Sequence, residues 1–113
     1  MRKAIAALIG VFILFTGTQA QASGTEYTYV QYVNKGYNRV IAIKCHFSNN
    51  WAFLKMGQNS SQLCGGNGWI ERTQVDPDMK LHAKNVNTGT LWIYPYGCNC
   101  QIGGGTYNVW VEP

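Results

Sequence analysis

Apolar and polar residues alternate with a period of two along much of the chain, which is typical of strands with one buried face. The clearest example is the segment 79–86, in which apolar side chains occupy every second position at its start. Other segments with this period are rich in β-branched and aromatic residues, which favours strands over helices. The pattern predicts strands at residues 27–33, 39–47, 51–56, 69–75, 79–86, 90–96 and 106–112.

Clusters of glycine and asparagine separate these segments, for example at residues 34–36, 65–68 and 87–89. Such residues favour turns because they tolerate backbone conformations that other side chains disfavour. Beyond residue 22, no segment shows a helical period over ten residues. The predicted fold is therefore all-β: a small antiparallel β-sandwich cross-linked by two disulfides, with a partly open barrel as the alternative.

Three short segments are similar to parts of an immunoglobulin-type sandwich. Cys45 ends an alternating strand, Tyr96-Gly97-Cys98 is similar to the tyrosine corner, and the glycine-rich residues 103–106 precede the last strand. That fold also has a tryptophan about twelve residues after its first cysteine, where this chain has glycine, glutamine and asparagine at 57–59. The similarity favours a sandwich over a barrel and assigns no family.

The first 22 residues are predicted to be a secretory signal peptide. Arg2 and Lys3 precede an apolar run at residues 4–15, and Ala20-Gln21-Ala22 carries small residues where signal peptidase requires them. The apolar run is shorter than the roughly 18 residues that span a membrane. We therefore expect cleavage after Ala22, one all-β domain over residues 23–113, a secreted or periplasmic location and no stable membrane anchor after cleavage.

The charge of the chain depends on this leader. Loss of Arg2 and Lys3 lowers the formal net charge from +4 to +2, and the remaining basic residues are scattered singly. Nucleic-acid-binding proteins usually carry a clustered basic surface. The sequence therefore predicts no nucleic-acid partner.

Four cysteines in an exported chain predict two structural disulfides. Two residues apart on a strand, Cys98 and Cys100 would point to the same face. Crosslinks from this pair to Cys45 and Cys64 are therefore favoured. The other arrangement joins Cys45 to Cys64 and Cys98 to Cys100. The latter arrangement would open the alternative of thiol–disulfide exchange. A zinc site that includes His46 or His82 is a weaker alternative, because the cysteine spacings match no zinc motif.

The sequence contains no recognisable catalytic or cofactor motif. Asp76 and Asp78 flank Pro77, which is explained by a turn. No serine lies in a Gly-x-Ser-x-Gly motif, and the triple glycine at 103–105 lacks the features of a phosphate-binding loop. We expect no catalytic residues, no cofactor, no metal and no enzymatic activity.

The aromatic residues are the candidate ligand-binding groups. In residues 90–96, Trp92, Tyr94 and Tyr96 share one face of the strand, and aliphatic residues share the other. If the aliphatic face is buried, the three rings form an exposed platform, flanked by Trp110 and Trp69. Cys98 has the same parity as the three rings, however, and a bridged cysteine usually points inward, which favours the alternative that the rings are core.

An exposed row of tryptophan and tyrosine suits the flat faces of sugars, and it also suits protein partners. The predicted function is therefore a small secreted or periplasmic binding domain for a glycan or cell-envelope polymer. The alternative is a secreted factor, such as an inhibitor, toxin or immunity-like protein, that acts on one protein partner.

Overall fold

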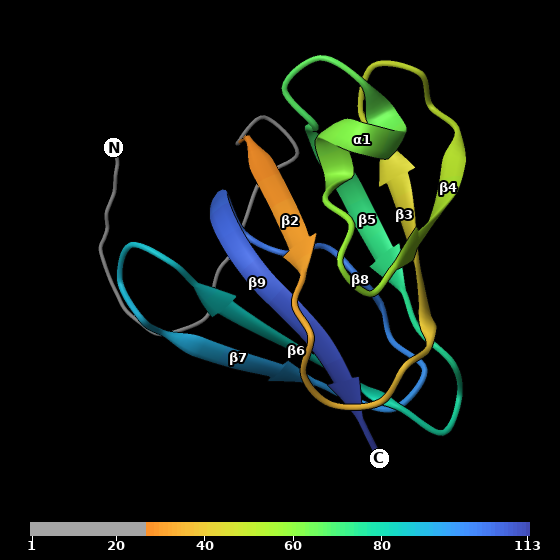
Figure 1. The fold of residues 1–113 in the computed structure, drawn as a ribbon, viewed down its shortest axis with the longest axis vertical. Helices are drawn as coiled ribbons and strands as arrows, with labels where there is room; N and C mark the ends of the chain where they lie inside the picture. Colours follow the sequence, from red (N-terminus) through yellow and green to blue (C-terminus); the bar gives the residue numbers. More distant parts are fainter. Residues whose placement is uncertain (1–26) are drawn as a thin grey trace.

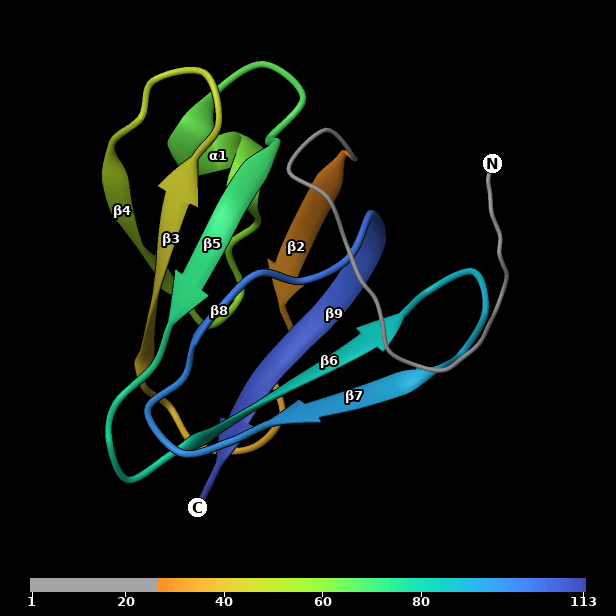
Figure 2. The ribbon, with the colours of Figure 1, turned by 180° about the vertical axis from the view of Figure 1, so that it is seen from behind.

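A computed structural model describes residues 27–113 of the chain, so the predicted leader at residues 1–22 lies outside the described residues. Two four-stranded sheets face each other (Figures 1 and 2). The first sheet has the order β2 (Thr28–Tyr32), β9 (Gly105–Glu112), β6 (Lys80–Asn85) and β7 (Leu91–Tyr94). The second has the order β4 (Trp51–Lys55), β3 (Val40–Cys45), β5 (Ile70–Gln74) and β8 (Asn99–Cys100).

All pairs of neighbouring strands are antiparallel except β2 and β9, which run parallel. The sheets do not close into a barrel, so the predicted β-sandwich with two disulfides is confirmed. The parallel pair places the first and last strands of the described chain side by side, with β2 at the edge of its sheet.

A short helix, α1 (Ser60–Cys64), lies in the polar segment between β4 and β5. Asn59 caps it: the Gln62 N–H donates to the Asn59 Oδ1 atom at 3.1 Å, and the Asn59 N–H donates to the Gln62 Oε1 atom at 2.7 Å. The buried Ser60 hydroxyl accepts a hydrogen bond from the Val30 N–H. The helix therefore covers the free edge of β2, and five residues are too few to produce a helical period in the sequence.

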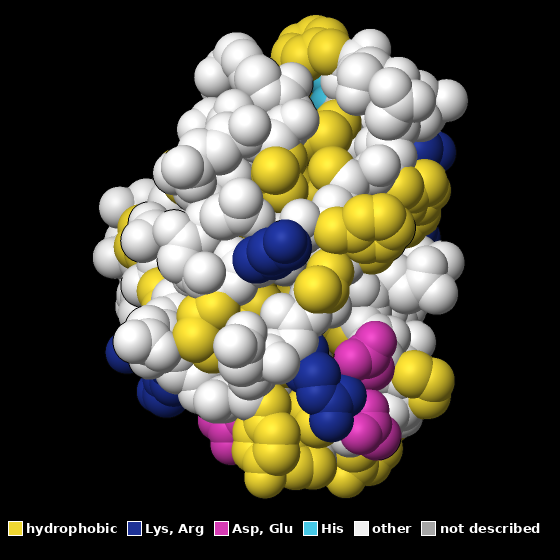
Figure 3. All heavy atoms as spheres, turned by 45° about the vertical axis from the view of Figure 1, so that its right-hand side comes forward, with side chains coloured by type: hydrophobic (Ala, Val, Ile, Leu, Met, Phe, Trp, Pro, Cys, Tyr) yellow, Lys and Arg dark blue, Asp and Glu magenta, His cyan; other side chains and the backbone are white. Residues whose placement is uncertain are grey.

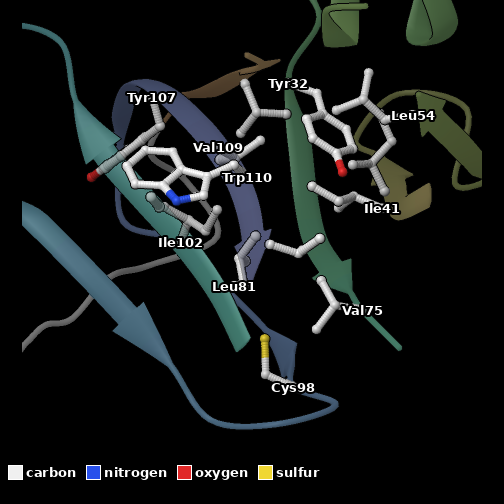
Figure 4. Close-up of a cluster of buried hydrophobic side chains, with 14 of the residues drawn as sticks. Tyr32, Ile41, Leu54, Val75, Leu81, Cys98, Ile102, Tyr107, Val109 and Trp110 are labelled. Carbon is white, nitrogen blue, oxygen red and sulfur yellow. The ribbon is translucent and has the colours of Figure 1, made fainter. Parts of the chain in front are cut away.

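The hydrophobic core lies between the two sheets (Figure 4). The predicted alternation is confirmed in three strands, whose every second residue is buried: Ile41, Ile43 and Cys45 in β3, Leu81 and Ala83 in β6, and Tyr107, Val109 and Val111 in β9. Burial of these side chains supplies the main stabilising term of the fold.

The disulfides join Cys45 to Cys64 and Cys98 to Cys100. The favoured crosslinks between the two pairs were therefore wrong. The prediction treated 98–100 as part of a regular strand, but β8 begins only at Asn99, after a turn in which Gly97 has φ of 61°. The Cα atoms of Cys98 and Cys100 lie 5.4 Å apart, and α1 places Cys64 beside Cys45 of β3 at the same Cα separation.

Candidate functional site

The three predicted platform rings do not form one outward row. Trp92 lies opposite Ala83 and Tyr94 lies opposite Leu81, and both partners are buried. Paired residues in a sheet point to the same face, so Trp92 and Tyr94 lie on the interior side of β7. Trp92 is 38% exposed because β7 extends beyond the second sheet, whereas Tyr94 packs against the core.

The environment of Tyr94 shows this inward orientation. Burial, with a smaller effect from the neighbouring Tyr107 hydroxyl, raises the pKa of Tyr94 to about 12. Tyr96 lies beyond the strand and is exposed, with the Lys80 Nζ atom 5.0 Å from its ring centre. The outward side of β7 carries Leu91 and Ile93 instead.

Trp110 points to the outer face of β9, as the alternation predicts, but only 4% of it is exposed. The Lys35 Nζ atom lies 4.2 Å from its ring centre, and the His82 ring stacks against it at 5.4 Å. Its indole N–H donates to the Glu112 Oε2 atom at 2.7 Å. The indole is therefore already covered by the protein's own side chains and offers little surface to a ligand.

Trp69 lies just before β5, in the other sheet from Trp92 and Trp110. Its ring stacks on His46 at 3.9 Å and meets the edge of Phe47 at 5.7 Å. His46 in turn contacts Glu71, with 2.7 Å between the Nδ1 and Oε2 atoms. The structure therefore does not bring the five predicted aromatic residues into one site.

A different set of aromatic residues is exposed on the outer face of the second sheet. Phe53 is 65% exposed and Trp51 is 42% exposed, and both lie on β4, two residues apart. Their side chains point away from the core because Ala52 and Leu54, which have the opposite parity, face it, and Leu54 is fully buried. Two rings thus lie in one column along the edge of the sheet.

The neighbouring strands add polar groups beside this column. Phe53 lies opposite Ala42, whose small side chain leaves the ring uncovered, and the same row continues through Gln74 to Asn99. The next row runs from Trp51 through Lys44 to Arg72. This surface, here called the aromatic–basic face, consists of Val40, Ala42, Lys44, Trp51, Phe53, Lys55, Arg72, Gln74 and Asn99.

The aromatic–basic face carries positive charge without acidic side chains among these described residues. Lys44, Lys55 and Arg72 supply the charge, and the Arg72 Nε atom donates to the Asn99 Oδ1 atom at 2.8 Å. This flat surface has aromatic rings on one side and cations and amides on the other. The rings can contact the apolar face of a ligand ring, and the cations and amides can bond to polar substituents of the same ligand.

An open hollow adjoins one end of this face. Its lining includes Asn34, Asn38, Arg39 and Asp76, and Val40 and Lys55 belong both to the hollow and to the face. Figure 3, turned to bring β4 forward, shows hydrophobic side chains along this side of the molecule and a group of basic and acidic side chains below them.

An ion-pair network joins Arg39 and Asp76 of the hollow to the nearby Asp78. The Arg39 guanidinium donates to Asp76 at 2.9 Å and to both carboxylate oxygens of Asp78 at 2.9 and 3.1 Å. Hydrogen bonds from Arg39 lower the pKa of the Asp78 carboxyl, and the two carboxylates raise the pKa of Arg39. The network therefore holds the Arg39 and Asp76 side chains of the hollow in place.

No family model matches this chain, and no curated protein or solved structure is significantly similar to it. The two disulfides are compatible with an oxidising compartment. Within residues 27–113, no helix is long and apolar enough to cross a membrane, and no group of three or more metal-binding side chains occurs.

The sequence analysis missed Trp51 and Phe53, although their segment was predicted to be a strand. The signal was present, because these two rings share their parity with Lys55, and a lysine rarely points into a core. The neighbouring parity holds Ala52 and Leu54, which are suited to the interior. A comparison of the two faces of this segment would have placed both rings outside.

Proposed function

We propose that this protein is an exported, non-enzymatic binding domain whose aromatic–basic face binds a glycan or cell-envelope polymer. The observation that carries the proposal is the pair of exposed rings, Trp51 and Phe53, next to amide and basic side chains on a flat sheet. The secreted or periplasmic location follows from the predicted leader and is part of the same proposal.

The arrangement fits the two-sided chemistry of sugars. The C–H face of a sugar ring packs on an aromatic ring, and its hydroxyls bond to planar amide and guanidinium groups. Rings two residues apart on a strand are separated by about 6.8 Å, so they can contact successive units of one polymer. Gln74, Asn99 and the groups of the adjoining hollow supply the hydrogen-bonding partners.

The charge of the face favours acidic polymers. Lys44 and Arg72 lie in the same row as Trp51, and no acidic residue belongs to the face to repel a carboxylate or phosphate. Exposed charges interact through a salt-screened field. Binding to an acidic polymer should therefore weaken as salt concentration rises, while binding to a neutral polymer should change little.

Tryptophan fluorescence titration with soluble neutral and acidic glycans and peptidoglycan fragments tests this proposal. Trp51→Ala should reduce the affinity at least tenfold, because an aromatic anchor is removed. Isothermal titration calorimetry measures this affinity, because the variant lacks the Trp51 fluorophore. Trp92→Ala is the matched control, since Trp92 is exposed to a similar extent on the edge strand of the other sheet. This variant should bind with the affinity of the wild type.

Loss of binding in Trp92→Ala but not in Trp51→Ala would contradict the proposed site. Absence of binding to every glycan, combined with one stoichiometric protein partner that Trp51→Ala no longer binds, would support the alternative of a protein-interaction factor. Circular dichroism of each variant shows whether the fold is retained.

A further inference from the structure

Strand β7 is exposed on both of its faces. Leu91 and Ile93 on the outer side are 45% and 55% exposed, and Trp92 on the inner side is also accessible. Among the described residues, β7 pairs only with β6 and ends its sheet. Figures 1 and 2 both show β7 at the outer margin of the first sheet, away from the second sheet.

The hydrogen-bonding groups at the free edge belong to Leu91 and Ile93. The Asn85 N–H donates to the Thr90 carbonyl at 2.9 Å, so these residues form a hydrogen-bonded pair where the β6–β7 ladder begins. Antiparallel ladders alternate between hydrogen-bonded and non-hydrogen-bonded pairs. Trp92 therefore bonds back to β6, whereas the backbone groups of Leu91 and Ile93 point outward.

This edge lacks the charged residues and the bulge that usually prevent strand pairing. Residues 85–96 contain no charged side chain, and the β6–β7 register continues without a bulge. Pro95 lies just beyond the strand. Natural edge strands are usually protected by lysine, proline, a bulge or a covering segment, and α1 covers the β2 edge of the same sheet in this way.

We infer that β7 pairs with β7 of a second copy of this chain, antiparallel and centred on Trp92. In this register Leu91 of one copy lies opposite Ile93 of the other, so the outward groups of both residues bond to each other. A register centred on Ile93 would place Leu91 opposite Pro95, which has no N–H. A register centred on Leu91 would place Ile93 opposite Gly89, whose N–H already bonds within the hairpin.

The same register preserves the two faces of the sheet. Leu91 and Ile93 of both copies form one apolar row outside, and the two Trp92 rings meet inside. The basic side chains of Lys80 and Lys84 lie on β6, one strand away from the contact, so like charges are not opposed. Because β7 carries no charge, it offers no ion pair to a charged peptide, and a second copy of the same strand fits it better.

The contact is small. Stable interfaces bury roughly 1,200–2,000 Å², and a pairing of two four-residue strands lies below this range. We therefore expect a dimer in concentration-dependent exchange. Sedimentation velocity of the wild-type protein should show a shift from monomer to dimer between about micromolar and millimolar concentration.

Cysteine crosslinking tests the register directly. Two Trp92 positions facing each other form a non-hydrogen-bonded pair with a Cα–Cα distance of about 4.5 Å, which a disulfide can span. Trp92→Cys should give a covalent dimer on mild oxidation, whereas Phe53→Cys, which is more exposed and lies on the other sheet, should remain monomeric. A covalent dimer of Phe53→Cys but not of Trp92→Cys would overturn the inference.

Two further variants test the backbone and the apolar row. Leu91→Pro removes one outward N–H without breaking a β6–β7 bond, and Ile93→Lys places a charge at the contact. Both should remain monomeric at concentrations where the wild type dimerises, with unchanged circular dichroism. A wild type that stays monomeric at millimolar concentration, or a dimer that both variants retain, would overturn the inference. Glycan binding by Trp92→Ala is measured separately, so the two proposals can fail independently.

Discussion

The loop between β2 and β3 depends on one buried hydroxyl group, that of Tyr32. The side chain is fully buried, its O–H donates to the Tyr37 carbonyl at 2.6 Å, and its oxygen accepts from the Arg39 N–H at 3.1 Å. Burial raises the pKa of Tyr32, so the hydroxyl remains protonated at neutral pH. The same loop carries Asn34 and Asn38 into the hollow beside the aromatic–basic face.

Tyr32→Phe removes both hydrogen bonds and leaves the ring in place. Each bond contributes about 0.5–1.5 kcal/mol, so we expect the free energy of unfolding to fall by about 2 kcal/mol. In a domain of this size, that corresponds to a decrease in Tm of about 8–16 °C. Urea unfolding followed by tryptophan fluorescence measures the difference.

Tyr37→Phe is the control, because Tyr37 is largely exposed and should tolerate the change within about 0.5 kcal/mol. Amide hydrogen exchange adds a local readout: the Arg39 N–H should exchange faster in Tyr32→Phe, because its acceptor is gone. A loss of stability below about 0.5 kcal/mol, with unchanged exchange at Arg39, would refute the argument that this hydroxyl holds the loop.

The remaining predictions concern the disulfides and alkaline pH. Loop-entropy arguments give a stabilisation of about 3 kcal/mol for the 19-residue Cys45–Cys64 loop and about 1 kcal/mol for the two-residue Cys98–Cys100 loop. Urea unfolding of the two double alanine variants should therefore show the larger loss of stability for the Cys45–Cys64 pair. Equal losses would contradict this. The raised pKa of Tyr94 means that the unfolded state ionises first, and stability should fall as pH rises from about 10 to about 12, by at most about 2–3 kcal/mol. Tyr94→Phe should lack this part of the loss, and an identical pH dependence in both proteins would show that the phenol is not buried as described.

The alternating pattern predicted the class of fold and every described strand except the two-residue β8. In β3, β6 and β9 a regular period of two coincides with burial, because each of these strands has one face on the core. The pattern was less informative for β7, where only Tyr94 is partly buried and the other three residues are exposed. When both faces of a strand are accessible, the alternation of side chains in its sequence does not indicate whether its aromatic rings point to the core or to solvent.

What the sequence determined by itself was local: the alternating strands, the turns and the even number of cysteines. The tertiary structure decided which strands are neighbours, which cysteines pair and which aromatic rings remain exposed. Trp110 shows the reason, because its outward orientation follows from parity, but Lys35 and His82, distant in sequence, cover it. Trp51 and Phe53 remain exposed because they lie on the outer face of an edge strand, and Phe53 has the small Ala42 opposite it. Exposure depends on such contacts between distant segments, which no local period records.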